Sequence, residues 1–480
     1  METDRISGAR RAGLLVAFVV MTVIAVGAAF LTPAGATPIP LPAPVTARFD
    51  AGNWHTCVVD DAGAVRCWGR NHNGQLGHGL NIITPSRVLV GDDEVPSVVG
   101  PVSLGGPGAL RVATGNNHTC ALLADLQVSC WGLNTYGRLG TGRQNRYGAA
   151  VGDDDSPGTI RVALGSNRSA KAIAAGGDHT CAITDEDNVR CWGKAFDGEA
   201  GYPNGDDFIG DTELLGSVGD VDLGGRSVKA IAAGESHTCV VTDNGSVFCW
   251  GDNEFGQLGY PDLQNKIGDT EDPIDAGPVN LGPGMKAVSV TAGGNHTCVT
   301  LENSKLRCWG QNATGATGLG TPTLDLSPSS GHVSLLTGPN TTSDIITADA
   351  GDNHTCAALV GTVHAVKCWG QGGDGAKDGR LGLPDLGNFD DLGDDELPST
   401  ALPLSLGGDS VIALAGGTAH TCAVTTDGTV RCWGSNEFGA VGHALGIYEE
   451  IGDDEEPGSI DPVDLGAEVN CFLCTPPTVP

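Results

Sequence analysis

One histidine-containing motif recurs seven times in this chain of 480 residues, at intervals of 58 to 66 residues. A regular period of this length is typical of a chain that stacks one supersecondary unit many times, and it limits the fold more than any other feature. The repeated histidines are His55, His118, His179, His237, His296, His354 and His420. The tryptophans that recur with them are Trp68, Trp131, Trp192, Trp250, Trp309, Trp369 and Trp433.

Each copy is predicted to form a β-hairpin. In the fourth copy the strands are expected at residues 240–242 and 246–250, joined by a tight turn at Asp243-Asn244-Gly245. Glycine at the end of this turn makes a positive φ angle inexpensive. Helices are disfavoured because no apolar period of 3.6 residues runs through these segments.

Two cysteines accompany each histidine, ten residues apart in six copies and twelve residues apart in one. In a symmetric hairpin an even separation places the two residues opposite each other, and two extra loop residues preserve that pairing. Opposed strand residues have Cα atoms roughly 4.5–5.5 Å apart, which suits a disulfide. The predicted disulfides are Cys57–Cys67, Cys120–Cys130, Cys181–Cys191, Cys239–Cys249, Cys298–Cys308, Cys356–Cys368 and Cys422–Cys432. The alternative is a metal site on His-x-Cys, although zinc more often takes closely spaced Cys-x-x-Cys pairs.

These residues resemble the repeats of the regulator of chromosome condensation family. The family motif is roughly Ala-Gly-x-x-His-Ser/Thr, then Gly-x-Val, Trp-Gly and Gly-Gln-Leu-Gly. In the fourth copy these pieces are Ala233-Gly234, His237-Thr238, Gly245-x-Val247, Trp250-Gly251 and Gly256-Gln257-Leu258-Gly259. The resemblance implies an all-β fold, a seven-bladed β-propeller of four-stranded blades, and propellers commonly have four to eight blades. The cysteine pairs depart from the intracellular members of the family.

The N-terminal segment is predicted to direct export. Arg5, Arg10 and Arg11 precede an apolar run over residues 14–31 and then a small-residue pattern ending at Ala36. This order is typical of a cleaved secretory signal peptide, here residues 1–36. A retained membrane anchor is the alternative, because the run is just long enough to span a bilayer. After cleavage we expect no membrane insertion and a secreted or cell-envelope protein, and such oxidising surroundings suit paired cysteines.

The rest of the chain divides into a Pro-rich linker at residues 37–45, a propeller at residues 46–470 and a tail at residues 471–480. In the tail, Cys471 and Cys474 are predicted to form a local disulfide. A Val-x-Leu-Gly segment stands before the later copies but not before the first, and another, residues 463–466, follows the last copy. We therefore expect this last segment to form a C-terminal strand that completes the first blade and closes the ring.

Acidic turns lie between the copies, and two interpretations of them stay open. Clustered carboxylates on a Gly turn could hold calcium. These turns lack the EF-hand pattern, however, and acidic turns are often solvated or use Asp to satisfy turn amides. The possible calcium ligands are Asp92, Asp93, Asp153, Asp154, Asp211, Asp269, Asp394 and Asp453.

Five of the seven residues that precede the second cysteine of a pair are basic. Strand alternation places them on the same face as the neighbouring tryptophans. We expect them to form salt bridges between blades. They are Arg66, Arg190, Arg307, Lys367 and Arg431.

The charge and the repetition restrict the function. A formal net charge of −32 argues strongly against nucleic-acid binding through phosphates, which needs a basic surface. Each His, Cys and Trp of the motif recurs in every copy, whereas a catalytic site needs a unique set of groups. The sequence also contains no Gly-x-Ser-x-Gly, phosphate loop or metal-binding helix motif. We therefore expect no enzymatic activity and no cofactor other than calcium.

The favoured function is a secreted or cell-surface module that binds an unidentified protein partner. Aromatic side chains often dominate interfaces, and the candidate contacts are Tyr136, Phe196, Tyr202, Phe255, Tyr260 and Phe438. Packing within the blade is the alternative for Phe255 and Phe438, which share an Asn-Glu-Phe-Gly frame. A structural envelope or matrix role is a second function. Guanine-nucleotide exchange is implied by the resemblance, but the acidity and the predicted export argue against it. The oligomeric state is not indicated.

Overall fold

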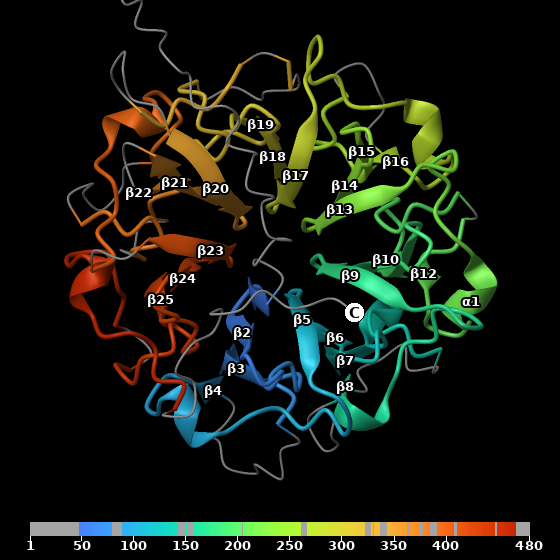
Figure 1. Ribbon diagram of the computed structural model, residues 1–480, viewed down its shortest axis with the longest axis horizontal. Coiled ribbons are helices and arrows are strands. Elements are labelled where there is room, and N and C mark those ends of the chain that lie inside the picture. Colours follow the sequence, from blue (N-terminus) through green and yellow to red (C-terminus); the bar gives the residue numbers. More distant parts are fainter. Residues whose placement is uncertain are drawn as a thin grey trace, which may run out of the picture. The chain divides into compact units, whose positions relative to one another are not determined.

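Seven antiparallel β-sheets, each built from one copy of the repeat, form the computed structural model (Figure 1). Neighbouring sheets pack against each other, and the last sheet packs against the first. The predicted all-β, seven-bladed propeller is therefore confirmed. The structure describes residues 48–78, 89–142, 150–151, 157–203, 205–260, 266–321, 328–329, 331–336, 343–361, 365–373, 378–384, 391–407, 410–446 and 449–466. The predicted signal peptide, the linker and the tail with Cys471 and Cys474 lie outside them.

The first four blades contain, from the centre outwards, an inner strand, the two strands of the hairpin and an outer strand. The first blade contains β1 (Phe49–Ala51), β2 (His55–Val59), β3 (Val65–Arg70) and β4 (Leu89–Val90). The second contains β5 (Ala109–Thr114), β6 (His118–Leu123), β7 (Val128–Leu133) and β8 (Ala150–Val151). The third contains β9 (Ala170–Ala175), β10 (His179–Thr184), β11 (Val189–Lys194) and β12 (Phe208–Ile209). The fourth contains β13 (Val228–Ala233), β14 (His237–Thr242), β15 (Val247–Asp252) and β16 (Lys266–Ile267).

The last three blades have three strands each within the described residues. The fifth contains β17 (Ala287–Ala292), β18 (His296–Leu301) and β19 (Leu306–Gly310). The sixth contains β20 (Ser343–Ala350), β21 (His354–Gly361) and β22 (Ala365–Gly370), and the seventh contains β23 (Val411–Gly416), β24 (His420–Thr425) and β25 (Val430–Gly434).

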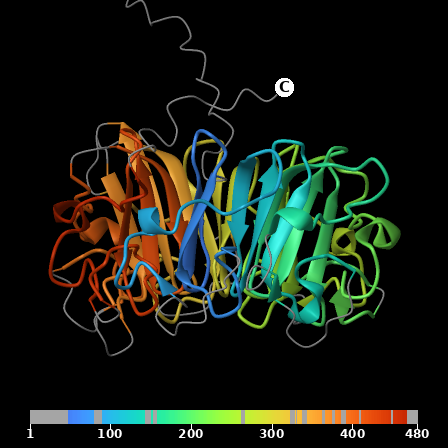
Figure 2. The same cartoon turned by 90° about the horizontal axis from the view of Figure 1, so that it is seen from below.

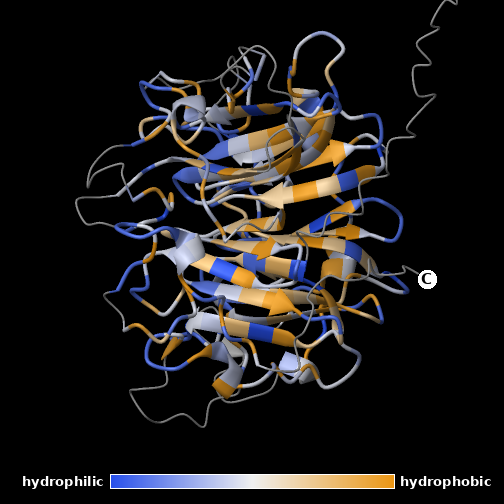
Figure 3. Ribbon diagram, turned by 60° about the vertical axis from the view of Figure 1, so that its left-hand side comes forward, coloured by the Kyte–Doolittle hydropathy of each residue, from blue (hydrophilic) through white to orange (hydrophobic). Residues whose placement is uncertain are grey.

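Short helices follow the outer strands, and one lies in a loop of the second blade. They are η3 (Pro96–Val98), η4 (Thr135–Gly137), η5 (Pro157–Thr159), α1 (Leu215–Val218), η6 (Pro273–Ala276), η7 (Pro398–Thr400) and η8 (Pro457–Ser459). None of the helices in the described part of the chain has the length and apolarity that crossing a membrane requires. The strands carry most of the apolar residues and many loops are hydrophilic (Figure 3).

The hairpins place the two cysteines of each pair directly opposite each other. Cys239 on β14 faces Cys249 on β15, and Cys356 faces Cys368 in the sixth blade, where the pair is twelve residues apart. In all seven pairs the sulfur atoms are bonded as disulfides at 2.02–2.10 Å, and the Cα atoms lie 4.0–4.2 Å apart, somewhat closer than the expected roughly 4.5–5.5 Å. The even spacing therefore predicted the register, including the longer sixth hairpin.

The hairpin turns need one residue with a positive φ angle. Gly245 supplies it in the fourth blade with φ of 83°, and Gly63 and Gly428 do so in the first and last. In three other blades a residue with a side chain adopts the same conformation. These residues are Leu126, Asp187 and Ser304.

The predicted closure of the ring by a C-terminal strand is wrong. All four strands of the first blade come from residues 49–90. The amide of Val463 donates to the carbonyl of Val430 on β25 at 2.8 Å, so this segment lies along the third strand of its own, seventh copy. Every copy shows the same bond, for example from Val279 to Val247 and from Val102 to Val65. Each Val-x-Leu-Gly segment thus completes the blade before it.

This correction predicts that Val463 is no more important than its counterparts. Val463 and Val279 are 6% and 5% exposed, so V463A and V279A should each lower the free energy of unfolding by about 2 kcal/mol. Urea denaturation of the two variants measures this. A cost for V463A several times that for V279A would restore the closing-strand interpretation.

Candidate functional site

The junction between neighbouring blades is made by one repeated set of hydrogen bonds. Between the third and fourth blades, His179 Nε2 lies 2.8 Å from Thr238 Oγ1, and that hydroxyl donates to the carbonyl of Glu199 at 2.9 Å. Trp250 Nε1 donates to the same carbonyl at 3.0 Å. Because the hydroxyl hydrogen is directed to the carbonyl, His179 Nε2 must be the donor in the first bond.

All seven junctions have these bonds. The Nε2 to Oγ1 distances are 2.7–2.9 Å, and the indole nitrogens lie 2.9–3.0 Å from the carbonyl oxygens. The histidine–threonine pairs are His55–Thr119, His118–Thr180, His179–Thr238, His237–Thr297, His296–Thr355, His354–Thr421 and His420–Thr56. The repeated tryptophans are fully buried. Their place in the protein is structural.

Burial keeps the repeated histidines neutral. Burial, with a smaller contribution from the nearby His179 and His296, lowers the pKa of His237 to about 3. The same cause lowers the pKa of His55 and His179 to about 3. Protonation would place a charge on Nδ1, which has no hydrogen-bond partner among the described residues in His237 and five other repeated histidines. These imidazoles therefore do not exchange protons near neutral pH.

This neutrality predicts a pH-dependent cost for H237Q. In the unfolded chain the histidine binds a proton below pH about 6.5, whereas in the folded chain it does not until about pH 3, so it contributes less stability as pH falls. The loss of unfolding free energy caused by H237Q should therefore be about 2 kcal/mol smaller at pH 5 than at pH 7.5. Urea denaturation of both proteins at each pH gives the difference. An equal cost at both pH values would show that the imidazole is not kept neutral.

Two carboxylates connect inner strands of neighbouring blades. Asp50 accepts a hydrogen bond from the amide of Thr114 at 2.7 Å, and Asp349 accepts one from the amide of Gly416 at 2.9 Å. Burial raises the pKa of Asp50 to about 7, with a contribution from Asp349, whose own pKa is raised to about 6. Because their pKa values are raised, these carboxyl groups contribute more stability as pH falls, whereas the histidines contribute less. The pH dependence of one protein therefore mixes both effects, and only the difference between H237Q and the parent reports the imidazole.

The strands run between two opposite faces of the propeller (Figure 2). The hairpin turns lie at one end of the blades. At the other end, the residue before each repeated histidine accepts a hydrogen bond from the residue after Trp-Gly, as Ser236 does from Asp252 at 2.8 Å. We call this end the loop face. It comprises the two residues before each repeated histidine and the loop from each Trp-Gly to the carbonyl that accepts the tryptophan bond.

The seven copies differ on the loop face, although their framework is constant. His-Thr-Cys and Cys-Trp-Gly occur in every copy. The two residues before the histidine, in contrast, are Asn53-Trp54, Asn116-Asn117, Gly177-Asp178, Glu235-Ser236, Gly294-Asn295, Asp352-Asn353 and Thr418-Ala419. The repeats therefore provide an internal comparison in which the loop face varies on a fixed frame.

Aromatic side chains form two clusters around this face. In one, Tyr136 stacks on Phe208 with ring centroids 5.2 Å apart, and Phe196 meets both rings edge-on at 5.9 and 5.3 Å. Phe196 is 39% exposed. Tyr136 has a φ angle of 68°, a strained conformation for a residue with a side chain. The sequence did not point to Phe208, which lies on the outer strand β12.

The second cluster lies at the junction of the seventh and first blades. Trp54 meets Phe438 edge-on at 5.1 Å, and the Arg70 guanidinium lies 5.2 Å from the centre of the Phe438 ring. Phe255 lies on the fourth blade and is half-buried. Aromatic residues of this face therefore occur on the seventh blade and on the first four, whereas the loops at residues 311–316 and 371–380 contain none.

Two of the expected contact residues are buried, and their predicted role was wrong. Tyr202 and Tyr260 are 9% and 7% exposed. The Tyr202 hydroxyl donates to the carbonyl of Gly219 at 3.1 Å, and the Tyr260 hydroxyl donates to that of Gly277 at 2.8 Å. Burial raises the pKa of both hydroxyls. Their shared Gly-Tyr-Pro frame was the signal of a repeated structural position.

Among the described residues, the basic residues before the second cysteines do not form the salt bridges expected between blades. Arg190 pairs with Asp220 at 2.6 Å, but Asp220 belongs to the same copy. Arg307 donates to the carbonyl of Pro328 at 2.9 Å and Lys367 to that of Pro398 at 3.2 Å. These long cationic side chains thus donate hydrogen bonds mainly to main-chain carbonyls. The sequence alone does not show whether such a side chain will pair with a carbonyl or with a carboxylate.

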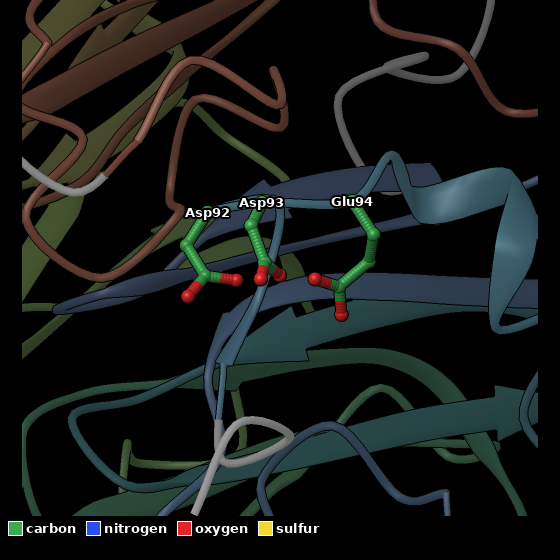
Figure 4. Close-up of side chains that lie close together, drawn as sticks. All are labelled: Asp92, Asp93 and Glu94. Carbon is green, nitrogen blue, oxygen red and sulfur yellow. The ribbon is translucent and has the colours of Figure 1, made fainter.

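Three of the acidic turns bring carboxylates together. In the first copy, Asp92, Asp93 and Glu94 each offer an oxygen, and these oxygens lie within 4.8 Å of one another (Figure 4). The same arrangement occurs at Asp394-Asp395-Glu396 and Asp453-Asp454-Glu455. Burial and the neighbouring carboxyl groups raise the pKa of Glu94 to about 8, and those of Glu396 and Glu455 to about 7.

The other acidic turns are arranged differently. In the third copy, Glu213 accepts a hydrogen bond from the amide of Gly210 at 2.5 Å, so a carboxylate satisfies the turn beside Asp211. In the fourth copy, Thr270 donates to Asp269 at 3.3 Å and to Glu271 at 2.8 Å. Asp153 and Asp154 lie outside the described residues. Oxygen-only clusters suit calcium, but only three of the predicted turns have that geometry among the described residues.

Calcium binding by the three triads stays a prediction. A carboxyl group must lose its proton before it binds a metal ion. Any calcium affinity should therefore rise up to about tenfold per pH unit between pH 6 and pH 7, below the pKa of Glu94. Calorimetric titration with calcium chloride measures this, with E94Q/E396Q/E455Q expected to lose the pH dependence and E302Q as the matched control. Binding that is independent of pH, or no binding at millimolar calcium, would contradict it.

Comparison with known proteins identifies the family. Residues 31–357 match the RCC1-like domain, and residues 411–440 match the regulator of chromosome condensation (RCC1) repeat. The chain belongs to the RCC1 repeat family. The repeated motif had indicated the same family.

The family's curated members are moderately similar. The ultraviolet-B receptor UVR8 of Arabidopsis thaliana is 29% identical over 337 residues, which cover 69% of this chain and 66% of the receptor. The human E3 ubiquitin-protein ligase HERC2 is 26% identical over 391 residues, which cover 81% of this chain and 7% of the ligase. The chain therefore spans less than two thirds of the length of these relatives.

Solved structures support the fold. The RCC1 protein of yeast, Prp20, in its complex with Kap60, has a TM-score of 0.61 at 19% identity, covering 90% of this chain and 88% of Prp20. Human WBSCR16 has a TM-score of 0.60 at 18% identity, covering 80% of this chain and 91% of its own. At these identities the likeness shows the fold alone.

Proposed function

We propose that this protein is an exported, non-catalytic module that binds a protein partner with its loop face. The observation that carries the proposal is the contrast between frame and face. The His-Thr-Cys and Cys-Trp-Gly framework is identical in all seven copies, whereas the residues on the loop face differ from copy to copy. A rigid frame that carries loops of variable sequence is a suitable arrangement for binding a partner, and the aromatic clusters lie on the loop face.

The residue types on this face support binding. Trp, Tyr and Arg are enriched among the side chains that dominate protein interfaces. Trp54, Tyr136 and Arg70 all belong to the two aromatic clusters, and Phe196 offers an exposed ring beside them. Yeast RCC1 (Prp20), which has a similar fold, is seen bound to the protein Kap60, so protein binding occurs elsewhere in the family.

The state of the repeated histidines supports a function without catalysis. General acid–base catalysis needs a group that exchanges a proton near the working pH. The seven imidazoles are buried, their Nε2 atoms are engaged by threonine, and burial lowers the pKa of each, as for His420 to about 4. They hold blades together and do not meet a substrate.

Export is supported by the cysteines. All fourteen cysteines of the described residues are paired, and none of these residues is a free cysteine. Disulfides persist in oxidising compartments and are rare in the cytosol. Together with the predicted signal peptide, the pairs favour a protein that works outside the cytoplasm.

Affinity capture tests the proposal. The mature, oxidised protein is immobilised and exposed to envelope and culture-medium proteins from its source. We expect one saturable partner whose affinity falls about tenfold or more in Y136A/F196A, because truncated interface aromatics commonly cost over 1–2 kcal/mol. The control is V98A, which truncates a more exposed apolar side chain on η3, outside the loop face.

The outcomes separate the two functions. Retention that V98A and Y136A/F196A reduce equally would place the binding site elsewhere. No retained partner, with or without calcium, would favour the structural envelope or matrix role instead.

A further inference from the structure

Carboxylates outnumber cations on the loop face. Its described residues contain four Lys or Arg side chains, Arg70, Arg138, Lys194 and Arg380. They contain nine carboxylates, Asp178, Asp197, Glu199, Glu235, Asp252, Glu254, Asp352, Asp378 and Glu437. The excess is of the same sign as the net charge of the whole chain, −32.

The four cations are already engaged within the protein. Arg138 pairs with Asp178 at 2.6 Å, and Arg380 pairs with Asp378. Lys194 lies 2.5 Å from Asp197 and 3.1 Å from Glu199. Arg70 covers the ring of Phe438. Three of the cations are thus ion-paired with four of the carboxylates, and Lys266 on β16 is a second partner of Asp197 at 2.7 Å.

Five carboxylates are left without a cation. They are Glu235, Asp252, Glu254, Asp352 and Glu437, and none lies within ion-pair distance of a Lys or Arg of the described residues. Glu254 and Glu437 are exposed, and each directly precedes an aromatic residue of the face, Phe255 or Phe438. Carboxylates without a cation therefore lie beside aromatic residues of the loop face.

The aromatic residues also define where a partner would lie. They occur on the seventh blade and on the first to fourth blades, and the loops of the fifth and sixth blades have none. Unpaired Glu437 and Glu254 lie near the two ends of this arc, on the seventh and fourth blades. A surface that covers the arc would contact both.

We propose that the loop face docks a protein surface that is basic and apolar, over an arc from the seventh blade through the first to the fourth. This proposal rests on the proposed function and specifies its partner. Aromatic anchors would supply the buried contacts, and the unpaired carboxylates would select cationic partners and reject acidic ones. A second copy of this chain is disfavoured as the occupant, because it would bring the same unpaired carboxylates against each other.

Peptide binding tests the chemistry. The probes are a fluorescein-labelled peptide that alternates lysine and leucine and a matched peptide with glutamate in place of lysine. We expect the lysine peptide to bind and the glutamate peptide not to bind. E254K/E437K should weaken the lysine peptide about tenfold or more, and F196A/F255A should also weaken it.

A matched control separates docking from general attraction to an acidic protein. E186K/E302K changes the net charge by the same amount, but both residues lie in hairpin turns at the opposite face. This control should change the affinity by less than about twofold at physiological salt, where the Debye length is about 8 Å. Equal losses in the two double variants would overturn the proposal.

The pH dependence gives an independent measurement. The exposed side chain of Glu235 lies near Asn116, Asp178, Asp352 and Lys194. Partial removal of its carboxyl group from water by these neighbours, together with repulsion by Asp352, raises the pKa of Glu235 to about 7. The lysine peptide should bind about threefold more tightly at pH 8 than at pH 6, because Glu235 then carries its charge. The expected change is smaller than tenfold because solvent screens the charge of Glu235 from the peptide. E235Q should abolish the change.

Other outcomes would overturn the basic partner without removing the binding module. Binding of the glutamate peptide that depends on Phe196 would confirm the face and reverse the chemistry. Sedimentation that shows a dimer abolished by F196A would make a second copy the occupant. Failure of both peptides to bind would also overturn it, whereas the capture experiment would still decide the proposed function.

Discussion

The fold depends on one carbonyl group per blade that accepts two hydrogen bonds from the next blade. At the junction of the third and fourth blades, the Glu199 carbonyl receives both Thr238 and Trp250. A buried carbonyl must be satisfied, and a second donor adds direction as well as energy. Gly201 stands beside it, where a Cβ atom would lie 2.8 Å from Trp250 Nε1, so only glycine allows the indole to approach. Thr56 and Trp68 make the same contact to Ala440, and this joins the seventh blade to the first without any exchange of strands.

This junction leaves the loops free to vary. The histidine, threonine and tryptophan hold the blades together, and the paired cysteines hold the strands within each hairpin. Both sets lie in the buried interior. The loop that follows Trp-Gly must only present one carbonyl at its end, so Gln75, Arg138, Glu199 and Ala440 can all occupy that position. Side chains earlier in the loop, such as Tyr136 and Phe438, are not needed for the junction and can serve a partner.

Features that depend only on residues within one hairpin were predicted correctly from the sequence. Features that depend on a residue far away in the chain were not. The Cys239–Cys249 register follows from hairpin length alone. The direction in which Val463 pairs does not, because a segment between two copies can complete either neighbour, and only its bond to Val430 decides. Tyr202 looked like an exposed loop residue, yet its hydroxyl is held by Gly219. The turn glycine Gly245 was predicted, but not that Leu126 would adopt a positive φ angle at the same position of its own hairpin.

The same distinction explains why charge on the loop face is informative. In the framework, each cation binds a nearby carbonyl or carboxylate, as Arg190 binds Asp220. On the loop face, three cations are likewise ion-paired with Asp178, Asp197 and Asp378. The carboxylates that remain have no Lys or Arg partner among the described residues. Uncompensated charge of one sign destabilises a compact protein through self-repulsion. Glu254 and Glu437 stand beside aromatic rings that the junctions do not require, so a partner that contributes cations there would relieve repulsion while it buries apolar surface.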